Sequence, residues 1–478
     1  MTFTSTRSVL SASSLETILR GLAPDGGLFV PRTIKGLNDL NGLDTLEKAE
    51  RFALDAFFDD IPEAVREAAI QNLLAKFPDD AHGGAVPLVN LGDFQLLELF
   101  HGPTGAFKDV ALSILPVLMA EAARQAGRGK VLVLTATSGD TGSAAMAGFA
   151  NVPGVEVAVF FPHTGTSRIQ RLQMTTPSAP NVHGIAIRGN FDDAQAAVKR
   201  IFSSAAMRAE AEAAGVTLSS ANSINTGRLV PQIAYYLLAA ANLVGDGPST
   251  VPFDVVVPSG NFGNILAAYY AKLLGAPIDR LVCASNVNDV LARFIATGTY
   301  DPGDRFTVTN SPSMDIRESS NVERLLWLVN GGLGDPESAA AETKRLMDDF
   351  AATGRYTLND AARETLQSHF IPGTADPEET EAEMRHLRAD TRGYIVDPHT
   401  AVATCVARKL GLPADGKPCV VAATATPYKF PETCLRAFGE DVLSDPPPAF
   451  AALETAPVTQ NQVVDVAEID DAVRALFR

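Results

Sequence analysis

FDVVVPSGNFGNILAAYYAKLLG (253–275) is the stretch that decides the fold. The apolar run at its start, 253–258, has the length and the β-branched content of a strand that is buried on both faces. Gly260 and Gly263 mark a short loop, and apolar residues then recur at helical spacing. A buried strand that passes through a glycine turn directly into a helix is typical of α/β proteins with parallel sheets.

The same strand–loop–helix succession recurs on both sides of this stretch. The other predicted strands are DFQLLELF (93–100), GKVLVLTA (129–136), VEVAVFFP (155–162), VHGIAIRG (182–189), RLVCASN (280–286) and CVVAATA (419–425). A helical pattern fills 45–77, and one long helix is predicted over 191–215. Residues 300–395 break the rhythm, because they are charged and helical only in patches.

These patterns predict an α/β protein with two parallel-type α/β domains. We expect an N-terminal region over 1–92 and a mainly smaller domain over 93–220. A mainly larger domain would take up 221–478 and would include the 300–395 region as a helical elaboration.

Composition and charge exclude several classes of protein. The 478 residues are 46% hydrophobic, so the chain can bury a sizeable core, and wholesale disorder is excluded. A net charge of −17 does not suit nucleic-acid binding. No run approaches the roughly 20 apolar residues of a membrane span, and the N-terminus has no apolar signal core, so we expect a cytoplasmic protein without membrane contact.

The cysteine and histidine patterns give no indication of a metal site. Four cysteines lie far apart, at 283, 405, 419 and 434, and no CxxC pair exists. A structural zinc site and a disulfide framework are therefore both unexpected. The seven histidines show no metal-ligand spacing, and His101 is interpreted as structural.

The glycine loop SGNFGN (259–264) is the first candidate for a functional site. Glycine permits close backbone approach, and the start of the following helix leaves N–H groups unpaired at the positive end of its dipole. Such a turn can hold a phosphate group. The spacing is not GxGxxG, and no GKS or GKT follows, so a dinucleotide site and a Walker loop are disfavoured. A purely structural strand-to-helix turn remains the alternative.

A second candidate is TATSGDTGSAA (135–145), which repeats the strand, polar glycine loop and helix. Ser138, Asp140 and Thr141 add side-chain oxygens to the backbone donors, as suits a carboxylate or phosphate of a small substrate. Asp140 would repel an anion, which argues against a purely anion-binding loop. The alternative is that Asp140 and Thr141 only cap the next helix.

The third candidate is Lys108 in HGPTGAFKDVAL (101–112), just before an apolar helix. Apolar surroundings and the helix N-terminus both favour the neutral amine. A neutral amine is the form that condenses with an aldehyde. The alternative is a surface lysine that is paired with Asp109.

Together these segments resemble the threonine synthase family, whose members are pyridoxal-phosphate (PLP) enzymes of fold type II, the tryptophan synthase β-like group. The resemblance covers most of the chain, and the elaborated 300–395 region is similar to the longer-chain branch of the family. It rests on nine motifs in the family's order: STRS (5–8), GLAPDGGLFVP (21–31), FHGPTGAFKDVAL (100–112), TATSGDTGSAA (135–145), NSINTGRLVPQ (222–232), PSGNFGN (258–264), SPSMDI with SSNVERL (311–325), DPHTA (397–401) and ATATPYKFPE (423–432).

The resemblance implies a role for each matching residue. Lys108 would form the Schiff base with PLP, Thr424 would face the ring nitrogen, and Asp140 would lie beside the cofactor. The PLP phosphate would be held by Gly260, Asn261, Phe262, Gly263 and Asn264. Ser138 and Thr141 would receive the amino-acid end of the substrate. The candidates for the substrate phosphate are Asn222, Ser223, Asn225 and Arg228, with an exposed structural role as the alternative for Arg228.

The reaction that the resemblance implies is conversion of O-phospho-L-homoserine and water to L-threonine and phosphate, by γ-elimination and β-addition of water. The partner would be this small molecule, and the protein would be a monomer or a homodimer. Two alternatives are another PLP-dependent lyase or phospholyase that acts on a related phosphorylated amino acid or amino alcohol, and a non-catalytic binding protein of the same fold.

The chain departs from the common family pattern at several positions. Thr426 and Tyr428 stand where TAHPAKF has His and Ala, and Ser8 stands where Gly is usual. NSINTGR replaces the commoner NSINWAR. A proton-transfer role for the missing histidine could not be filled by Thr426.

Overall fold

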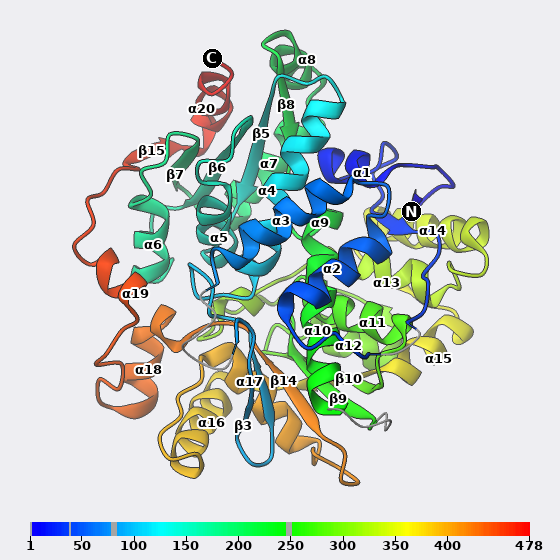
Figure 1. Ribbon diagram of the computed structural model, residues 1–478, viewed down its shortest axis with the longest axis vertical. Coiled ribbons are helices and arrows are strands. Elements are labelled where there is room, and N and C mark those ends of the chain that lie inside the picture. The colour runs from blue at the N-terminus through cyan, green and yellow to red at the C-terminus, as the bar shows by residue number, and fades with distance from the viewer. Residues whose placement is uncertain (1, 38–39, 78–83, 245–250) are drawn as a thin grey trace.

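The computed structural model describes residues 2–37, 40–77, 84–244 and 251–478, and within these ranges it contains two largely parallel sheets (Figure 1). The six-stranded sheet has the order β13-β10-β9-β14-β4-β3, and the five-stranded sheet has the order β15-β7-β6-β5-β8. All pairs within them are parallel except β3 with β4. The strands of the larger sheet are β3 (Leu88–Asn90), β4 (Gln95–Glu98), β9 (Phe253–Pro258), β10 (Ile278–Ser285), β13 (Phe370–Thr374) and β14 (Cys419–Ala423). Those of the smaller sheet are β5 (Lys130–Ala136), β6 (Val155–Pro162), β7 (Val182–Arg188), β8 (Val216–Ser219) and β15 (Gln462–Asp465).

Helices cover these sheets and fill the space between them. The first half of the chain has α1 (Ser14–Arg20), α2 (Leu46–Phe57), α3 (Glu63–Leu74), α4 (Lys108–Gln125), α5 (Asp140–Phe149), α6 (Arg168–Thr175), α7 (Phe191–Ser203), α8 (Ala205–Ala213), α9 (Thr226–Leu229) and α10 (Pro231–Val244). The second half has α11 (Gly263–Leu274), α12 (Val290–Thr297), α13 (Val322–Val329), α14 (Pro336–Thr353), α15 (Asp360–His369), α16 (Pro377–Asp390), α17 (Pro398–Lys409), α18 (Pro431–Phe438), α19 (Pro448–Leu453) and α20 (Ile469–Ala475). Two short antiparallel pairs are β1 (Phe3–Ser5) with β2 (Phe29–Pro31) and β11 (Thr299–Tyr300) with β12 (Tyr356–Thr357). Short 3-10 helices at Pro312–Met314, Pro427–Lys429 and Val466–Glu468 complete the described elements.

The fold class agrees with the prediction from the sequence, since β9 and β14 are buried along their whole length. The burial of both strand faces explains their uninterrupted apolar runs. The apolar helices α10 and α11 pack against each other behind the larger sheet. The glycine loop therefore connects β9 to α11, a helix that is buried along most of its length.

Two helical regions carry more detail than their sequence patterns predict, and one predicted helix is wrong. The pattern over 45–77 forms two helices, α2 and α3, with Pro62 at the N-cap of the second. The single helix predicted over 191–215 breaks at Ser204, whose extended backbone (ψ 111°) ends α7 and whose hydroxyl accepts the Met207 N–H at 3.2 Å to cap α8. The 300–395 region is helical in patches, as predicted, and it also contains β13, which pairs with β10 and extends the larger sheet.

Two strands lie in a different sheet from the one that their sequence range predicts. β4, within 93–220, pairs with β14 of the larger sheet. β15, within 221–478, pairs with β7, so the end of the chain returns to the smaller sheet (Figure 1). Residues 78–83 lie outside the described residues, and the segment that follows them ends in β3. The domain boundaries along the sequence therefore stay a prediction. In space, the chain crosses from one sheet to the other at β4 and at β15.

Glu50 on α2 is a buried carboxyl group whose oxygens have no hydrogen-bond partner among the described residues. Burial raises its pKa well above the usual 4.5. The folded state therefore keeps a proton that the unfolded chain releases, and stability falls as pH rises above 4.5, by up to about 1.4 kcal/mol per pH unit. We expect Glu50→Gln to gain stability relative to the wild type as pH rises from about 5 to about 8. Urea unfolding across that range measures the difference, and a pH-independent difference would contradict this assignment.

Candidate active site

The loops at the carboxyl ends of β5 and β9 line a shared cleft of about 1670 Å³, together with Lys108 at the start of α4. In open parallel sheets, ligands bind at this end of the strands, because the loops there are free to carry functional side chains. The predicted site residues that line the cleft are Lys108, Ser138, Asp140, Thr141, Asn222, Ser223 and Asn261. Residues more than 150 positions apart in the sequence thus meet at one cavity.

The Lys108 loop is fixed to the backbone that follows β14. The Phe107 N–H donates to the Thr424 carbonyl at 2.9 Å, and the Thr426 N–H donates to the Gly105 carbonyl at 3.0 Å. Gly105 has a φ of +69°, and a Cβ there would lie 2.6 Å from the Thr426 methyl carbon. These bonds place Lys108 at the first residue of α4, beside the end of the larger sheet.

The Lys108 amine faces Asp140, with 3.3 Å between Nζ and Oδ2, and its side chain is only 12% exposed. Burial lowers the pKa of Lys108, the Asp140 charge opposes this, and the charges of Arg228 and Lys429 lower the pKa further. The pairing with Asp109 that we considered does not occur, because the Asp109 carboxylate accepts the Thr104 hydroxyl at 2.6 Å and the Thr104 N–H at 2.9 Å.

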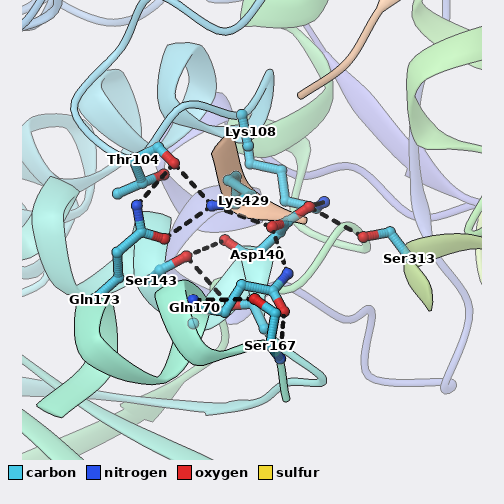
Figure 2. A network of polar contacts seen from close by, with 12 residues as sticks. Thr104, Lys108, Asp140, Ser143, Ser167, Gln170, Gln173, Ser313 and Lys429 are labelled. Atoms are coloured by element: carbon cyan, nitrogen blue, oxygen red, sulfur yellow. Dashed lines mark hydrogen bonds and ion pairs between the residues drawn. The ribbon is translucent and has the colours of Figure 1, made fainter. Parts of the chain in front are cut away.

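Asp140 is the centre of the polar network in this cleft (Figure 2). Its Oδ2 accepts from Lys108 at 3.3 Å and from the Ser313 hydroxyl at 3.0 Å. Its Oδ1 accepts from Gln170 at 2.8 Å and lies 3.1 Å from Lys429 Nζ. Burial alone would raise the pKa of Asp140, but the positive charges of Lys429 and Lys108 and the Gln170 bond hold it well below its ordinary value. Asp140 is thus a carboxylate.

Capping of α5 falls to Thr137, not to Asp140 or Thr141. The Thr137 hydroxyl accepts the N–H groups of Gly139 at 2.9 Å and Gly142 at 3.0 Å. This arrangement satisfies donors at the start of the helix and leaves the Asp140 carboxylate free to face the two lysines. The capping alternative for Asp140 is therefore wrong.

The glycine loop packs against the segment that carries Ser313. A Cβ on Gly260 would meet the Ser313 carbonyl oxygen at 2.7 Å, so only glycine fits there. Phe262 has a left-handed backbone (φ 61°) and turns the chain into α11. Ser319 Oγ donates to the Gly260 carbonyl at 2.8 Å, and Asn321 Nδ2 donates to the Asn261 carbonyl at 3.0 Å. These two bonds occupy the loop carbonyls and leave its N–H groups at the helix start as the available donors.

Asn264 supplies the observation that points most directly to a ligand in this loop. Its Oδ1 accepts the hydroxyls of Tyr235 and Tyr236, each at 2.7 Å. Those bonds fix the amide orientation, and the buried Nδ2 has no partner among the described residues. A buried amide donor without a partner beside a helix N-terminus suits an anion.

The donor set fits PLP. The loop with Asn264 suits its phosphate, and the Lys108 amine of lowered pKa suits its aldehyde. Thr424 directly follows β14 and is buried. Its carbonyl accepts the N–H of Phe107, the residue before Lys108. Its assignment to the ring nitrogen stays a prediction.

Two predicted substrate residues lie apart from the cleft lining. The Asn225 amide is fully buried, with Nδ2 donating to the Ile18 and Ser220 carbonyls and Oδ1 capping α9. Arg228 is buried rather than exposed, its Nη1 donates to the Ala221 carbonyl at 2.6 Å, and burial lowers its pKa to about 10. The observed contacts of both side chains support the fold, and their substrate contacts stay predictions.

The residues that vary from the common family pattern have structural partners. The Tyr428 hydroxyl donates to the Asp445 carbonyl at 2.7 Å, and the Ser8 hydroxyl donates to Asp25 at 2.5 Å. Thr426 packs its methyl group against Gly105 and so does not reach out as a proton donor. His101 pairs with Glu98 at 2.6 Å, which agrees with its interpretation as structural.

The polar network also contains five residues that the sequence did not identify as site residues: Gln170, Gln173, Ser313, His399 and Lys429. His399 Nδ1 pairs with buried Asp397 at 2.6 Å, and its Nε2 accepts the Ser313 N–H at 3.0 Å, which holds Ser313 against Asp140. Ser313, His399 and Lys429 lie in the motifs SPSMDI, DPHTA and ATATPYKFPE. Their place in these motifs was the sequence signal by which they could have been identified. Gln170 and Gln173 had none, because an amphipathic helix gives no indication of which polar residue turns inward.

Within the described ranges, no helix is both long and apolar enough to span a membrane. The same residues hold no group of three or more His, Cys, Asp or Glu side chains that could bind a metal ion. All four cysteines are buried and unpaired with one another.

Comparison with known proteins gives matches along nearly the whole chain. Residues 87–358, more than half of the chain, match the family of pyridoxal-phosphate dependent enzymes. Residues 2–72 match the threonine synthase N terminus, and 400–475 match the threonine synthase C-terminal family.

Individual relatives point the same way. Threonine synthase of Pseudomonas aeruginosa is 38% identical over 444 residues, which cover 91% of this chain and 90% of that protein. A crystal structure of PLP-bound threonine synthase from Brucella melitensis has a TM-score of 0.89 and 34% identity, with all of both chains covered. Threonine synthase from yeast has a TM-score of 0.90 and 32% identity over 99% of this chain and 98% of that one. The chain therefore belongs to the threonine synthase family of PLP-dependent enzymes.

Proposed function

We propose that the protein converts O-phospho-L-homoserine and water to L-threonine and inorganic phosphate. The observation that carries the proposal is the meeting, in one cleft, of the Lys108 amine, the Asp140 carboxylate and the glycine loop, in a chain that matches threonine synthases over nine-tenths of its length. The substrate has an amine, a carboxylate and a phosphate ester, and the cleft offers groups for each.

The net reaction fixes what the protein must do with protons. The γ-carbon loses phosphate and gains a proton, the β-carbon exchanges a proton for hydroxyl from water, and the α-proton is removed and returned. PLP, when bound, supplies the electron sink that makes the α- and then the β-hydrogens acidic. Every proton transfer then needs a nearby base whose proton affinity is low enough for the proton to be given back.

Lys108 Nζ is the group that fits this role. Burial and two neighbouring cations lower its pKa, so its neutral amine is available closer to neutral pH than that of a surface lysine. Asp140 Oδ2 stabilises the protonated form of Lys108, because it accepts a hydrogen bond from Nζ at 3.3 Å. Ser138 and Thr141, on the loop that carries Asp140, are proposed to hold the amino-acid end of the substrate.

Exclusion of water from the cleft is the remaining requirement, since reactive intermediates must not be hydrolysed early. The cleft lies between the two sheets and is bordered by the 306–320 segment and by the loop after β5. We propose that these two sides approach each other on substrate binding. We also propose a cytoplasmic location and a monomeric or homodimeric state.

The test is a coupled assay of purified, PLP-loaded enzyme with O-phospho-L-homoserine. We expect phosphate and threonine in equal amounts, with no ammonia. Phosphate together with ammonia and a keto product would instead indicate a phospholyase. No reaction, together with no visible absorbance from bound PLP, would favour a non-catalytic binding protein.

A further inference from the structure

Lys429 is a fully buried lysine whose amine has three polar neighbours (Figure 2). It follows the 423–426 segment in the short helix Pro427–Lys429. Nζ donates to the Thr104 carbonyl at 2.7 Å and to Gln173 Oε1 at 2.9 Å, and it lies 3.1 Å from Asp140 Oδ1. Burial of an ammonium group without charge compensation is strongly unfavourable, so this arrangement makes Asp140 its counter-ion.

Asp140 therefore lies between two lysines, with Lys108 at Oδ2 and Lys429 at Oδ1. The two amines differ in access, because Lys108 lines the cleft whereas Lys429 does not. Lys108 must lose its positive charge during the reaction, whereas the Lys429 side chain has no exposed surface and does not reach the cleft. When the charge on Lys108 is lost, the buried carboxylate would have no cation if Lys429 were absent.

We propose that Lys429 is a positioning residue of the reaction, which keeps Asp140 ionised while Lys108 changes charge and makes the Lys108 proton easier to remove. The proposal rests on the proposed function only for the place of Lys108 at the reacting carbon atoms. Repulsion between the two ammonium groups disfavours protonated Lys108, and attraction to Lys429 disfavours transfer of that proton to Asp140.

Other charges near these groups do not duplicate the effect. Arg228 on α9 also lowers the pKa of Lys108, but in the described structure its guanidinium donates to the Ala221 carbonyl and not to Asp140. The His399 ring on α17 contacts Ser313 and Asp397 rather than Asp140, since its Nε2 accepts the Ser313 N–H at 3.0 Å and its Nδ1 lies 2.6 Å from Asp397 Oδ2. Asp109, the other nearby carboxylate, is occupied by Thr104. Besides Lys108, Lys429 is therefore the lysine that lies directly against Asp140 in the described structure.

The primary test measures the titration of the Lys108 amine in the enzyme freed of cofactor. Labelling with a small amine-reactive acylating reagent across a pH series, followed by peptide mass spectrometry, gives the midpoint for Lys108. We expect Lys429→Met to raise this midpoint by about one to two pH units. Lys429→Arg keeps the charge and should restore the midpoint to within a fraction of that shift. In Lys429→Met, the acid-side midpoint of the pH profile of kcat should also shift to higher pH by a similar amount, measured with PLP-loaded enzyme.

Lys76→Met is the matched control. Lys76 is partly buried, and like Lys429 its amine donates to backbone oxygen atoms, here the carbonyls of Ala147 at 3.3 Å and Gly148 at 2.9 Å. In the described structure these contacts do not include Asp140. Its loss should lower stability without moving the Lys108 midpoint. If Lys429→Met likewise lowers stability and leaves the midpoint in place, Lys429 is only structural and the proposal is overturned.

A second pair of variants keeps the proposal testable if Lys429→Met does not fold. Asp140→Asn leaves Lys429 as an uncompensated cation, and Asp140→Asn/Lys429→Met removes both charges. The Lys108 midpoint should be lower in the single variant than in the double variant, and equal midpoints would overturn the proposal. Absence of threonine formation with the predicted midpoint shifts would refute the proposed function and leave the role of Lys429 intact.

Discussion

Lys108→Ala is expected to lower threonine formation by at least about 10⁴-fold, because one side chain provides both the attachment point of the cofactor and the base. The geometry assigns both tasks to Nζ, which is the amine that lines the cleft and faces Asp140. The variant should still fold, since the Lys108 side chain has only the Asp140 bond to lose among its hydrogen bonds in the described structure. Steady-state assay with substrate and PLP in excess measures the effect.

Lys108→Arg is the matched control for this prediction. It keeps a positive charge beside Asp140 but lacks an amine that can condense with an aldehyde. We expect its stability to be close to that of the wild type and its activity to be as low as that of Lys108→Ala. Substantial activity in either variant would show that another residue provides the amine.

Gly260→Ala is expected to weaken PLP binding by about 10- to 100-fold, the consequence of forcing a methyl group into a packed site. The new Cβ would lie 2.7 Å from the Ser313 carbonyl oxygen, a backbone atom that cannot rotate away. Relief requires the loop or the 313 segment to move. Movement of the loop displaces the N–H donors at the start of α11, and movement of the segment breaks the Ser313–Asp140 bond of 3.0 Å. Equilibrium titration of the apoenzyme with PLP, followed by visible absorbance, gives the affinity.

Gly334→Ala serves as the control, because a Cβ there would find its nearest atom at 3.6 Å and Gly334 does not line the cleft. It should leave PLP affinity unchanged. If Gly260→Ala binds PLP as tightly as Gly334→Ala, the glycine loop does not hold the cofactor in the way that the packing indicates.

The sequence was sufficient for the fold class and for the central parts of the site. Buried parallel strands need long apolar runs, and the loops at their carboxyl ends carry glycine and polar residues, so β5 and β9 and the loops after them could be identified directly. Local patterns were weaker at helix breaks. The break at Ser204 depends on one hydroxyl that caps the next helix, a choice that composition alone does not reveal.

Contacts between distant segments were beyond what the sequence could give. Lys429 reads as an ordinary lysine in a loop, yet it is buried because Thr104, Gln173 and Asp140 from three other segments surround its amine. Conversely, Asn225 and Arg228 have the chemistry of phosphate ligands, and only tertiary packing directs them into backbone contacts. The return of β15 to the smaller sheet is equally a matter of long-range pairing, since each β15 residue pairs with a β7 residue 277 positions earlier in the chain.

Borohydride reduction of the PLP-loaded enzyme, followed by peptide mapping with mass spectrometry, tests most directly whether Lys108 carries the cofactor. Reduction makes the bond between PLP and its lysine permanent. We predict a single modified peptide that contains Lys108, with Lys429 unmodified because its amine is buried and paired with Asp140. Modification of any other lysine in place of Lys108, or no modified lysine, would contradict the assignment of the active site.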